Sequence, residues 1–207
     1  MHPRPQTSGF ARHWNLDHAT VFLNHGSFGA CPREVITAQQ ALRDQMEREP
    51  VRFFVEDFSP LMDAARRAVA SFVNCDWQNI APVPNATTAV ATVIENAART
   101  LGASDRPLVG EGDEILISAH EYPACRNNIR RHAGRINAGV VSAEIPFPLP
   151  RDPAVAERTI LDAVLSKVTS RTRLALLSHV TSPTGLVLPI TALVDSLERR
   201  GVATLVD

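Results

Sequence analysis

The chain has 207 residues, of which 44% are hydrophobic, so it is long and apolar enough to bury a sizeable core. Its 21 basic and 22 acidic residues give a formal net charge of −1, and the arginines are scattered, so we expect no nucleic-acid-binding and no membrane-binding surface. The cysteines Cys31, Cys75 and Cys125 lie far apart, which disfavours a zinc site or a disulfide framework, and the absence of a signal-peptide pattern predicts a cytoplasmic protein.

Residues 1–58 are expected to form an N-terminal segment distinct from the rest. The apolar run Val21–Leu23 predicts a short strand that leads into Asn24–Gly29, where two glycines would let the backbone approach a ligand closely. On this segment alone, a simple turn is the favoured explanation. Pro32 then predicts the start of a helix, and residues 50–58 form an aromatic-rich connector.

Residues 59–207 are expected to form an α/β domain. Ser59 and Pro60 predict the start of its first helix, with a buried apolar stripe that includes Leu61, Val69 and Phe72. The other predicted helix boundaries are the ends at Asn74, Gly102 and Gly201 and the start at Asp152. Short apolar runs then alternate with helical patterns, which predicts a parallel sheet with right-handed crossovers. The expected strands are 80–83, 114–118, 140–145, 174–177 and 202–206.

One of the polar loops after these strands has the features of an anion site. Asn85 is a suitable N-cap for a helix, and the free amides of Ala86, Thr87 and Thr88 lie at the positive end of the helix dipole with two hydroxyls. A capped helix without a ligand explains this segment as well.

Three more loops add other chemistry at the carboxyl edge of the sheet, where α/β proteins bind ligands. Tyr122 precedes a proline and should project from a strand-to-helix loop, Thr181 and Ser182 supply hydroxyls, and Asp207 supplies a carboxylate. An anion site, an aromatic plane, hydroxyls and an acid together suit pyridoxal 5′-phosphate (PLP), a planar phosphorylated heterocycle with a basic ring nitrogen. The glycine-rich dinucleotide and P-loop motifs do not occur in the sequence.

Taken in this order, Asn24–Gly29, Asn85–Thr88, His120–Tyr122 and His179–Gly185 resemble the class V aminotransferase family, and within it the isopenicillin N epimerase-like branch. The resemblance spans essentially the whole chain. It implies the N-terminal portion of a fold-type I PLP enzyme, whose large domain is a three-layer α/β structure with a mainly parallel sheet, here incomplete at its C-terminal side. Such enzymes are normally homodimers that act on amino acids or amines by epimerase, transaminase or lyase chemistry through an aldimine.

The resemblance also implies roles for single residues. Ala86 and Thr87, beside Thr88, would bind the cofactor phosphate, and Tyr122 would stack on the ring where cysteine desulfurases usually have a histidine. The remaining implied positions are Thr181 and Ser182 near the phenolic oxygen, Asp207 at the ring nitrogen, and Asn24, His25 and Gly26 near the substrate.

The lysine that forms the internal aldimine in this family would follow Asp207, and the sequence contains only Lys167, at the end of a predicted helix away from the ligand edge. No catalytic residue is therefore assigned, and we expect the chain to be inactive alone. Two hypotheses follow: the N-terminal part of a PLP enzyme with an amino-acid-type substrate, or a shortened non-catalytic α/β protein that binds a phosphorylated ligand or a partner subunit.

Overall fold

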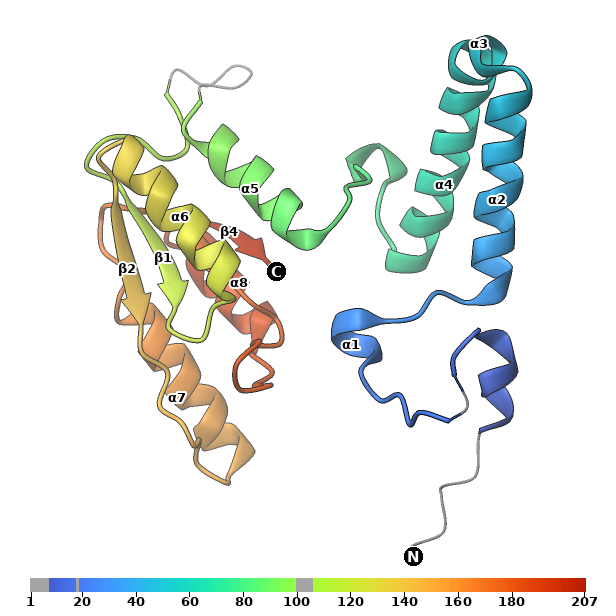
Figure 1. Cartoon of the computed structure of the whole chain (residues 1–207). Coiled ribbons are helices and arrows are strands. Elements are labelled where there is room, and N and C mark those ends of the chain that lie inside the picture. The colour runs from blue at the N-terminus through green and yellow to red at the C-terminus, as the bar shows by residue number, and fades with distance from the viewer. Residues whose placement is uncertain (1–7, 18, 100–105) are drawn as a thin grey trace, which may run out of the picture. The chain divides into compact units, whose positions relative to one another are not determined.

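The computed structural model of the chain describes residues 8–17, 19–99 and 106–207, which belong to two compact units, Met1–Pro82 and Val83–Asp207 (Figure 1). The elements of the first unit are η1 (Gly9–His13), α1 (His25–Phe28), α2 (Arg33–Arg48), α3 (Pro50–Arg52), η2 (Phe53–Asp57), α4 (Phe58–Val73) and η3 (Trp77–Asn79). The elements of the second unit are α5 (Ala86–Ala97), β1 (Glu114–Ser118), α6 (Pro123–Arg135), β2 (Gly139–Ala143), α7 (Pro153–Leu165), β3 (Thr172–Leu177), α8 (Ile190–Glu198) and β4 (Ala203–Val206). The boundary expected between residues 58 and 59 falls at the start of α4, inside the first unit, and stays a prediction for the domains of the whole protein.

A widened helical turn carries the chain into α4. Ser59 and Pro60 do not begin this helix, as the sequence predicted, but lie within it, and the preceding Asp57 is already helical. The N–H of Phe58 donates to the carbonyl of Phe53, a bond over five residues that is typical of a π-turn. This wider turn accommodates Pro60, which has no N–H to donate and whose ring crowds the preceding turn. The helix ends where the sequence indicated, with Asn74 in the left-handed conformation at φ 56°.

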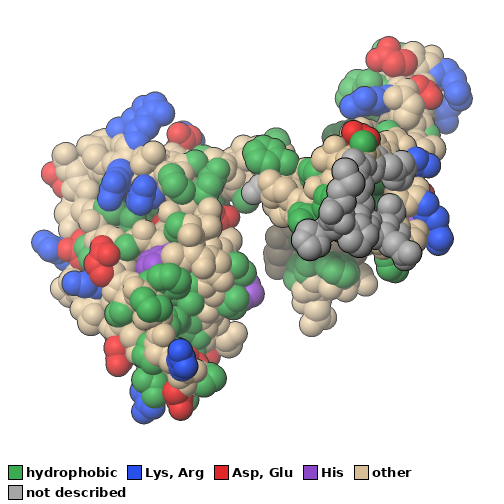
Figure 2. Space-filling model, turned by 60° about the horizontal axis from the view of Figure 1, so that its bottom comes forward, with side chains coloured by type: hydrophobic (Ala, Val, Ile, Leu, Met, Phe, Trp, Pro, Cys, Tyr) green, Lys and Arg blue, Asp and Glu red, His purple; other side chains and the backbone are tan. Residues whose placement is uncertain are grey.

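Apolar side chains of α2 and α4 remain exposed in this chain. Apolar residues at helical spacing share one face of each helix, and the stripe of α4 was predicted to be buried, but α2 has no buried residue and α4 has only Ala70. Figure 2 shows hydrophobic side chains at the surface of both units. The exposed members of the two stripes are Val35, Ile36, Leu42, Leu61, Val69 and Phe72. Exposed apolar surface of this extent is typical of a face that other polypeptide covers.

The second unit is built on four parallel strands in the order β2-β1-β3-β4. In the register of the sheet, Ile115 pairs with Val140 on one side and with Leu174 on the other, and Leu174 pairs with Ala203. All residues of β1 are buried, as expected of a strand that is covered on both faces. The expected parallel α/β sheet is confirmed.

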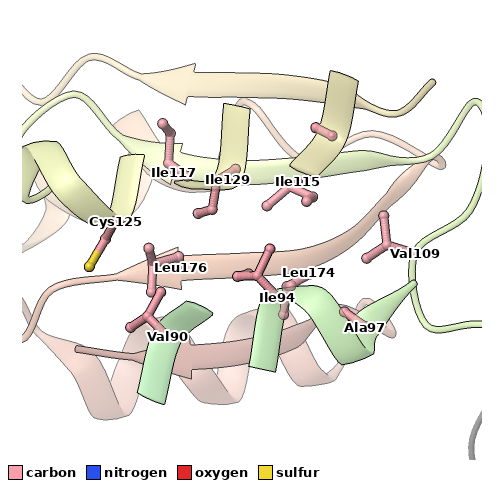
Figure 3. Close-up of a cluster of buried hydrophobic side chains, with 11 residues drawn as sticks. Val90, Ile94, Ala97, Val109, Ile115, Ile117, Cys125, Ile129, Leu174 and Leu176 are labelled. Atoms are coloured by element: carbon pink, nitrogen blue, oxygen red, sulfur yellow. The ribbon is translucent and has the colours of Figure 1, made fainter. Parts of the chain in front are cut away.

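Helices cover the two faces of this sheet and make it the middle of three layers. Ile115 and Ile117 face a cluster that includes Val90 of α5 and Ile129 of α6 (Figure 3). Leu116 lies between them in the chain and faces the opposite cluster, which contains residues of α7 and α8. This alternation follows from the two-residue period of a strand.

Local sequence signals fix where most helices of this unit begin and end. The side chain of Asp152 accepts a hydrogen bond from the amide of Val155 at 3.0 Å and caps α7, with Pro153 as its first residue. Pro123 likewise opens α6, and Gly201 at φ 71° follows α8 as predicted. The predicted end of α5 at Gly102 lies outside the described residues; the helix itself ends at Ala97.

Three further expectations about the first 83 residues are wrong. Val21–Leu23 and Ile80–Val83 are not strands, because no neighbouring strand pairs with either of them in the described part of the chain. Asn24–Gly29 is not an open turn either, since His25–Phe28 form one helical turn. Gly29 comes directly after this helical turn, and its backbone lies close to it: a Cβ at Gly29 would stand 2.6 Å from the carbonyl oxygen of His25.

Across the described residues, no helix combines the length and apolarity that crossing a membrane requires.

Glu114 ties the first residue of β1 to the turn before β3. Its buried carboxylate accepts hydrogen bonds from the hydroxyl of Thr169 at 2.6 Å and from the guanidinium of Arg171 at 2.5 Å. The bond from Thr169, followed by the bond and charge of Arg171, lowers the pKa of Glu114 below 4.5 against the raising effect of burial. The folded state therefore favours the ionised form more than the unfolded state does.

We expect Glu114→Gln to lower the free energy of unfolding by about 1–3 kcal/mol at neutral pH, the usual cost of losing hydrogen bonds to a charged group. Because the folded pKa is lowered, this contribution is present above pH 4.5 and disappears as the pH falls through the folded value. Urea denaturation followed by circular dichroism measures the difference. The exposed Glu111→Gln is the matched control, expected within about 0.5 kcal/mol of the wild type. An undiminished difference well below pH 4.5 would contradict the role of the charge.

Candidate functional site

The carboxyl ends of the strands and the amino ends of α5 and α6 lie at the same end of the second unit. In Figure 3, β1 and β3 run toward the end at which Cys125 and Val90 lie, near the starts of α6 and α5. Ala97, at the other end of α5, lies near Val109 at the amino end of the sheet. Residues that follow a strand and residues that begin these two helices therefore share one edge.

The amino end of α5 offers backbone donors to an anion. The side-chain oxygen of Asn85 accepts the amide hydrogen of Thr88 at 2.8 Å and caps the helix as predicted. The amides of Ala86 and Thr87 are not used by the helix itself, since the first amides of an α-helix have no intrahelical acceptor. The helix dipole adds positive potential at the same place. The donor set fits a phosphate group, with Ala86 exposed and Thr87 half-buried.

Tyr122 lies between β1 and α6 with its backbone fixed on both sides. Its N–H donates to the Glu121 carboxylate at 3.1 Å, and its carbonyl accepts the first hydrogen bond of α6 from Arg126 at 3.0 Å. Its side chain is 42% exposed. The ring thus projects from a strand-to-helix loop, as predicted, and keeps a solvent-accessible surface on which a flat ring can stack.

Asp207 follows the last residue of β4 and is held by its backbone and by its side chain. Its N–H donates to the carbonyl of Leu177 at 3.0 Å, and its carbonyl accepts from the amide of His179 at 2.8 Å. The thiol of Cys125 donates to Oδ2 of Asp207 at 3.5 Å. Leu205 packs against the cluster under α5 and α6, so Asp207, two residues later, belongs to the same face of the sheet.

Cys125 was not predicted as part of the site. Cys125 belongs to α6 and is buried on the face of the helix that packs on the sheet. Burial, followed by the charge of Asp207, raises the pKa of Cys125 to about 12. A usable signal existed, since Cys125, Ile129 and Ala133 recur every four residues and mark the inward face of the helix. The thiol stays protonated at neutral pH and acts as a donor to Asp207.

Thr181 uses its hydroxyl to build the loop after β3. The side chain is 1% exposed, accepts the amide hydrogen of Leu186 at 2.9 Å, and lies 2.7 Å from the hydroxyl oxygen of Thr184. Ser182, by contrast, is exposed. Of the two predicted hydroxyls, Ser182 is the more accessible to a ligand.

His120 extends this network to the loop after β2. Its Nε2 lies 3.0 Å from the carbonyl oxygen of Ile145, and its Nδ1 lies 3.0 Å from the hydroxyl of Thr184. A carbonyl only accepts, so Nε2 carries the hydrogen and the Nδ1 of a neutral His120 accepts from Thr184. The Thr184 hydroxyl is also hydrogen-bonded to that of Thr181, so one chain of hydrogen bonds joins three loops.

Glu121 is a second residue to which the sequence pattern assigned no role. Its side chain is 1% exposed and accepts hydrogen bonds from the hydroxyl of Ser178, from the Ser178 amide at 3.2 Å, and from the Tyr122 amide. Burial raises the pKa of Glu121 against these hydrogen bonds, and the negative charge of Asp207 raises it further. A glutamate between a histidine and a tyrosine carries no local signal that it is buried.

The three residues predicted near the substrate lie in the other unit. Asn24 precedes α1, and His25 and Gly26 are part of it. The His25 ring packs against those of Trp14 and Phe22, at centroid distances of 5.8 and 4.7 Å. Their place near a substrate stays a prediction.

Lys167 does not lie at the ligand edge. It is exposed, directly after α7, and two residues ahead of Thr169, which bonds to the first residue of β1. It therefore lies at the amino end of the sheet, as predicted. Within residues 8–17, 19–99 and 106–207, no group of three or more His, Cys, Asp or Glu side chains is placed to hold a metal ion.

Comparison with known proteins adds family information to this geometry. The family model for Aminotransferase class-V matches residues 22–207. An isopenicillin N epimerase from Amycolatopsis lactamdurans is 34% identical over 196 residues, covering 93% of this chain and 45% of that protein. An L-cysteine desulfhydrase from Arabidopsis thaliana is 25% identical over 208 residues, covering 96% of this chain and 45% of that protein. The chain thus spans less than half the length of these relatives.

Solved structures share the fold at lower sequence identity. A lysine-to-alanine mutant of C-DES, with glycine covalently linked to its PLP cofactor, has a TM-score of 0.79 at 23% identity and covers 95% of this chain and 49% of that one. The cysteine desulfurase CsdA from Escherichia coli has a TM-score of 0.74 at 22% identity, covering 96% and 47%. The expected fold is confirmed over about half the length of these enzymes.

The burial of the Cys125 thiol leads to a prediction about its chemical modification. Because the thiolate is the reactive form, the raised pKa and the burial of Cys125 should protect it from iodoacetamide in the folded chain at mildly alkaline pH. The exposed Cys31 and Cys75 should be alkylated, and all three should react in urea. Peptide mass spectrometry measures each site. Alkylation of Cys125 as fast as the other two, in a chain that stays folded, would contradict its placement.

Proposed function

Because the chain belongs to the class V aminotransferase family, we propose that it is the N-terminal part of a PLP-dependent enzyme that acts on an amino acid or amine. The reaction we propose is of the epimerase, transaminase or lyase type. One observation carries the proposal: the free amides of α5, the accessible ring of Tyr122 and the held carboxylate of Asp207 belong to the same edge of one sheet.

Each of these groups has a distinct task in the proposal. PLP, when bound, supplies an electron sink for carbanion chemistry next to the substrate nitrogen. The amides of Ala86 and Thr87, with the Thr87 and Thr88 hydroxyls, bind the phosphate. Tyr122 stacks on the ring, and Asp207 accepts a hydrogen bond from the protonated ring nitrogen.

The contacts around Asp207 support its proposed role. Its backbone is bonded to residues on both sides of Ser178, and its Oδ2 receives the Cys125 thiol, so the second oxygen can serve a ligand. Both neighbouring acids, Cys125 and Glu121, have raised pKa values because they are buried beside its charge. Because the Cys125 thiol stays uncharged, the negative charge of this pair lies on the Asp207 carboxylate, which suits a cationic N–H donor.

The proposal requires contributions from outside these residues. The lysine that would bind the cofactor covalently is not among the 207 residues, so the proposed activity needs another segment of polypeptide. We further propose a homodimer, which the exposed apolar stripes of α2 and α4 support. Asn24, His25 and Gly26 are proposed to contact the substrate.

The phosphate site can be tested without any reaction. We expect Thr87→Ala to weaken non-covalent binding of PLP roughly tenfold to a hundredfold, since a hydrogen bond to a charged group is worth about 1.5–3 kcal/mol. Equilibrium dialysis measures the affinity. Pyridoxal, which lacks the phosphate, should bind the variant and the wild type equally. Thr92→Ala on the same helix is the matched control, because the Thr92 hydroxyl bonds to the Thr88 carbonyl instead. Unchanged affinity for PLP would place the phosphate elsewhere.

The stacking role of Tyr122 gives a second test. Tyr122→Ala should weaken binding of both PLP and pyridoxal, whereas Tyr122→Phe should bind both nearly as well as the wild type, because stacking needs the ring and not the hydroxyl. The same dialysis experiment reports both affinities. If the phenylalanine variant loses as much affinity as the alanine variant, the hydroxyl has a role that the stacking model does not include.

A further inference from the structure

Glu121 joins the loop after β1 to the loop after β3. One carboxylate oxygen, Oε1, accepts the Tyr122 amide hydrogen at 3.1 Å and the Ser178 hydroxyl, and Oε2 accepts the Ser178 amide hydrogen at 3.2 Å. Tyr122 follows Glu121 directly, and Ser178 follows the last residue of β3. A single buried side chain therefore connects residues 57 positions apart in the sequence.

On one side of this connection, the carboxylate fixes the direction of the Tyr122 side chain. The Tyr122 N–H is held by Glu121, its carbonyl is held by the Arg126 amide, and Pro123 restricts the next backbone torsion. With both of its peptide groups held, the Cα–Cβ bond of Tyr122 has one direction relative to α6. The exposed ring can turn about its own torsions but cannot move with a flexible loop.

On the other side, the carboxylate is bonded to the residue between the two backbone partners of Asp207. Leu177 accepts the Asp207 amide hydrogen at 3.0 Å, His179 donates to the Asp207 carbonyl at 2.8 Å, and Ser178 lies between them in the chain. Any shift of Ser178 would displace these partners. The path from the ring of Tyr122 to the acid of Asp207 thus runs through the carboxylate of Glu121.

We propose that Glu121 is a positioning residue that sets the ring of Tyr122 relative to the carboxylate of Asp207. Its consequence for ligand binding rests on the proposed function, but the connection itself exists in the ligand-free chain. At 1% exposure Glu121 touches no ligand and acts only through its neighbours. Burying a carboxyl group is costly, and three donors converging on it are what compensate that cost.

The chain offers a direct probe, because Tyr122 is its only tyrosine. Labelling with 3-fluorotyrosine places one fluorine on this ring, and fluorine NMR then gives a single resonance. We expect Glu121→Gln to shift and broaden it, since the glutamine amide nitrogen cannot accept the hydrogen of the Ser178 amide. Ser178→Ala should shift the resonance in the same direction by a smaller amount, because it removes one donor and keeps Glu121.

The matched control is Glu144→Gln, an exposed glutamate beyond the end of β2, which should leave the resonance unchanged. Far-UV circular dichroism of every variant shows whether it is folded. If Glu121→Gln does not fold, Ser178→Ala decides, because it leaves the carboxylate in place. An unchanged fluorine shift and line width in folded Ser178→Ala and Glu121→Gln chains would overturn the proposal.

Ligand affinity supplies the second readout. We expect Glu121→Gln to weaken binding of PLP and of pyridoxal alike, by about fivefold to tenfold, as expected from the loss of one positioning hydrogen bond. This pattern differs from that of Thr87→Ala, which should affect PLP alone. If neither the wild type nor any variant binds PLP, the proposed function fails, while the fluorine resonance still decides the role of Glu121. Weakened binding of PLP with unchanged binding of pyridoxal would contradict a role in ring placement.

Discussion

Parallel pairing of β1 with β3 is the constraint on which the rest of the second unit depends. Both strands are buried between helices, so each must return through a helix and each must end at the same edge. Tyr122 after β1, Ser178 after β3 and Asp207 after β4 share that edge for this reason alone. Because backbone groups at strand ends need new partners, polar side chains accumulate there. Glu121 and Thr181 supply such partners, to Tyr122 and Ser178 and to Leu186.

Buried ionisable groups determine the electrostatics of this edge. Cys125 and Glu121 are almost fully buried beside Asp207, and both have raised pKa values. Burial disfavours the charged form of each group, and the Cys125 thiol stays neutral beside the Asp207 carboxylate. The carboxylate of Asp207 is half-buried and receives a neutral thiol. A positively charged ring nitrogen would complete this arrangement without an additional counter-ion.

Sequence patterns predicted the features that depend on neighbouring residues in the chain. They failed for features that depend on a partner segment far away in the sequence. Continuous apolar runs predicted β1 and β3, and Asn85 and Asp152 predicted where their helices begin, because a cap acts within a few residues. Val21–Leu23 and Ile80–Val83 have the same apolar character but no neighbouring strand in the described part of the chain. Glu121 was missed for a related reason: its partner Ser178 is 57 positions away, and no local pattern encodes that pairing.

Two surfaces are uncovered in the described part of the chain. In the first unit, the apolar stripes of α2 and α4 are exposed, and in the second unit β4 has a hydrogen-bonded neighbour on one side and an exposed Val206. An uncovered strand edge and an uncovered apolar helix face are both prone to association. The chain covers 45% of an epimerase relative and 49% of the C-DES chain, so those proteins have further polypeptide available for such surfaces. The proposed function requires additional polypeptide independently, because its lysine must come from outside these residues. The exposed surfaces therefore support the same requirement for additional polypeptide that the proposed function makes.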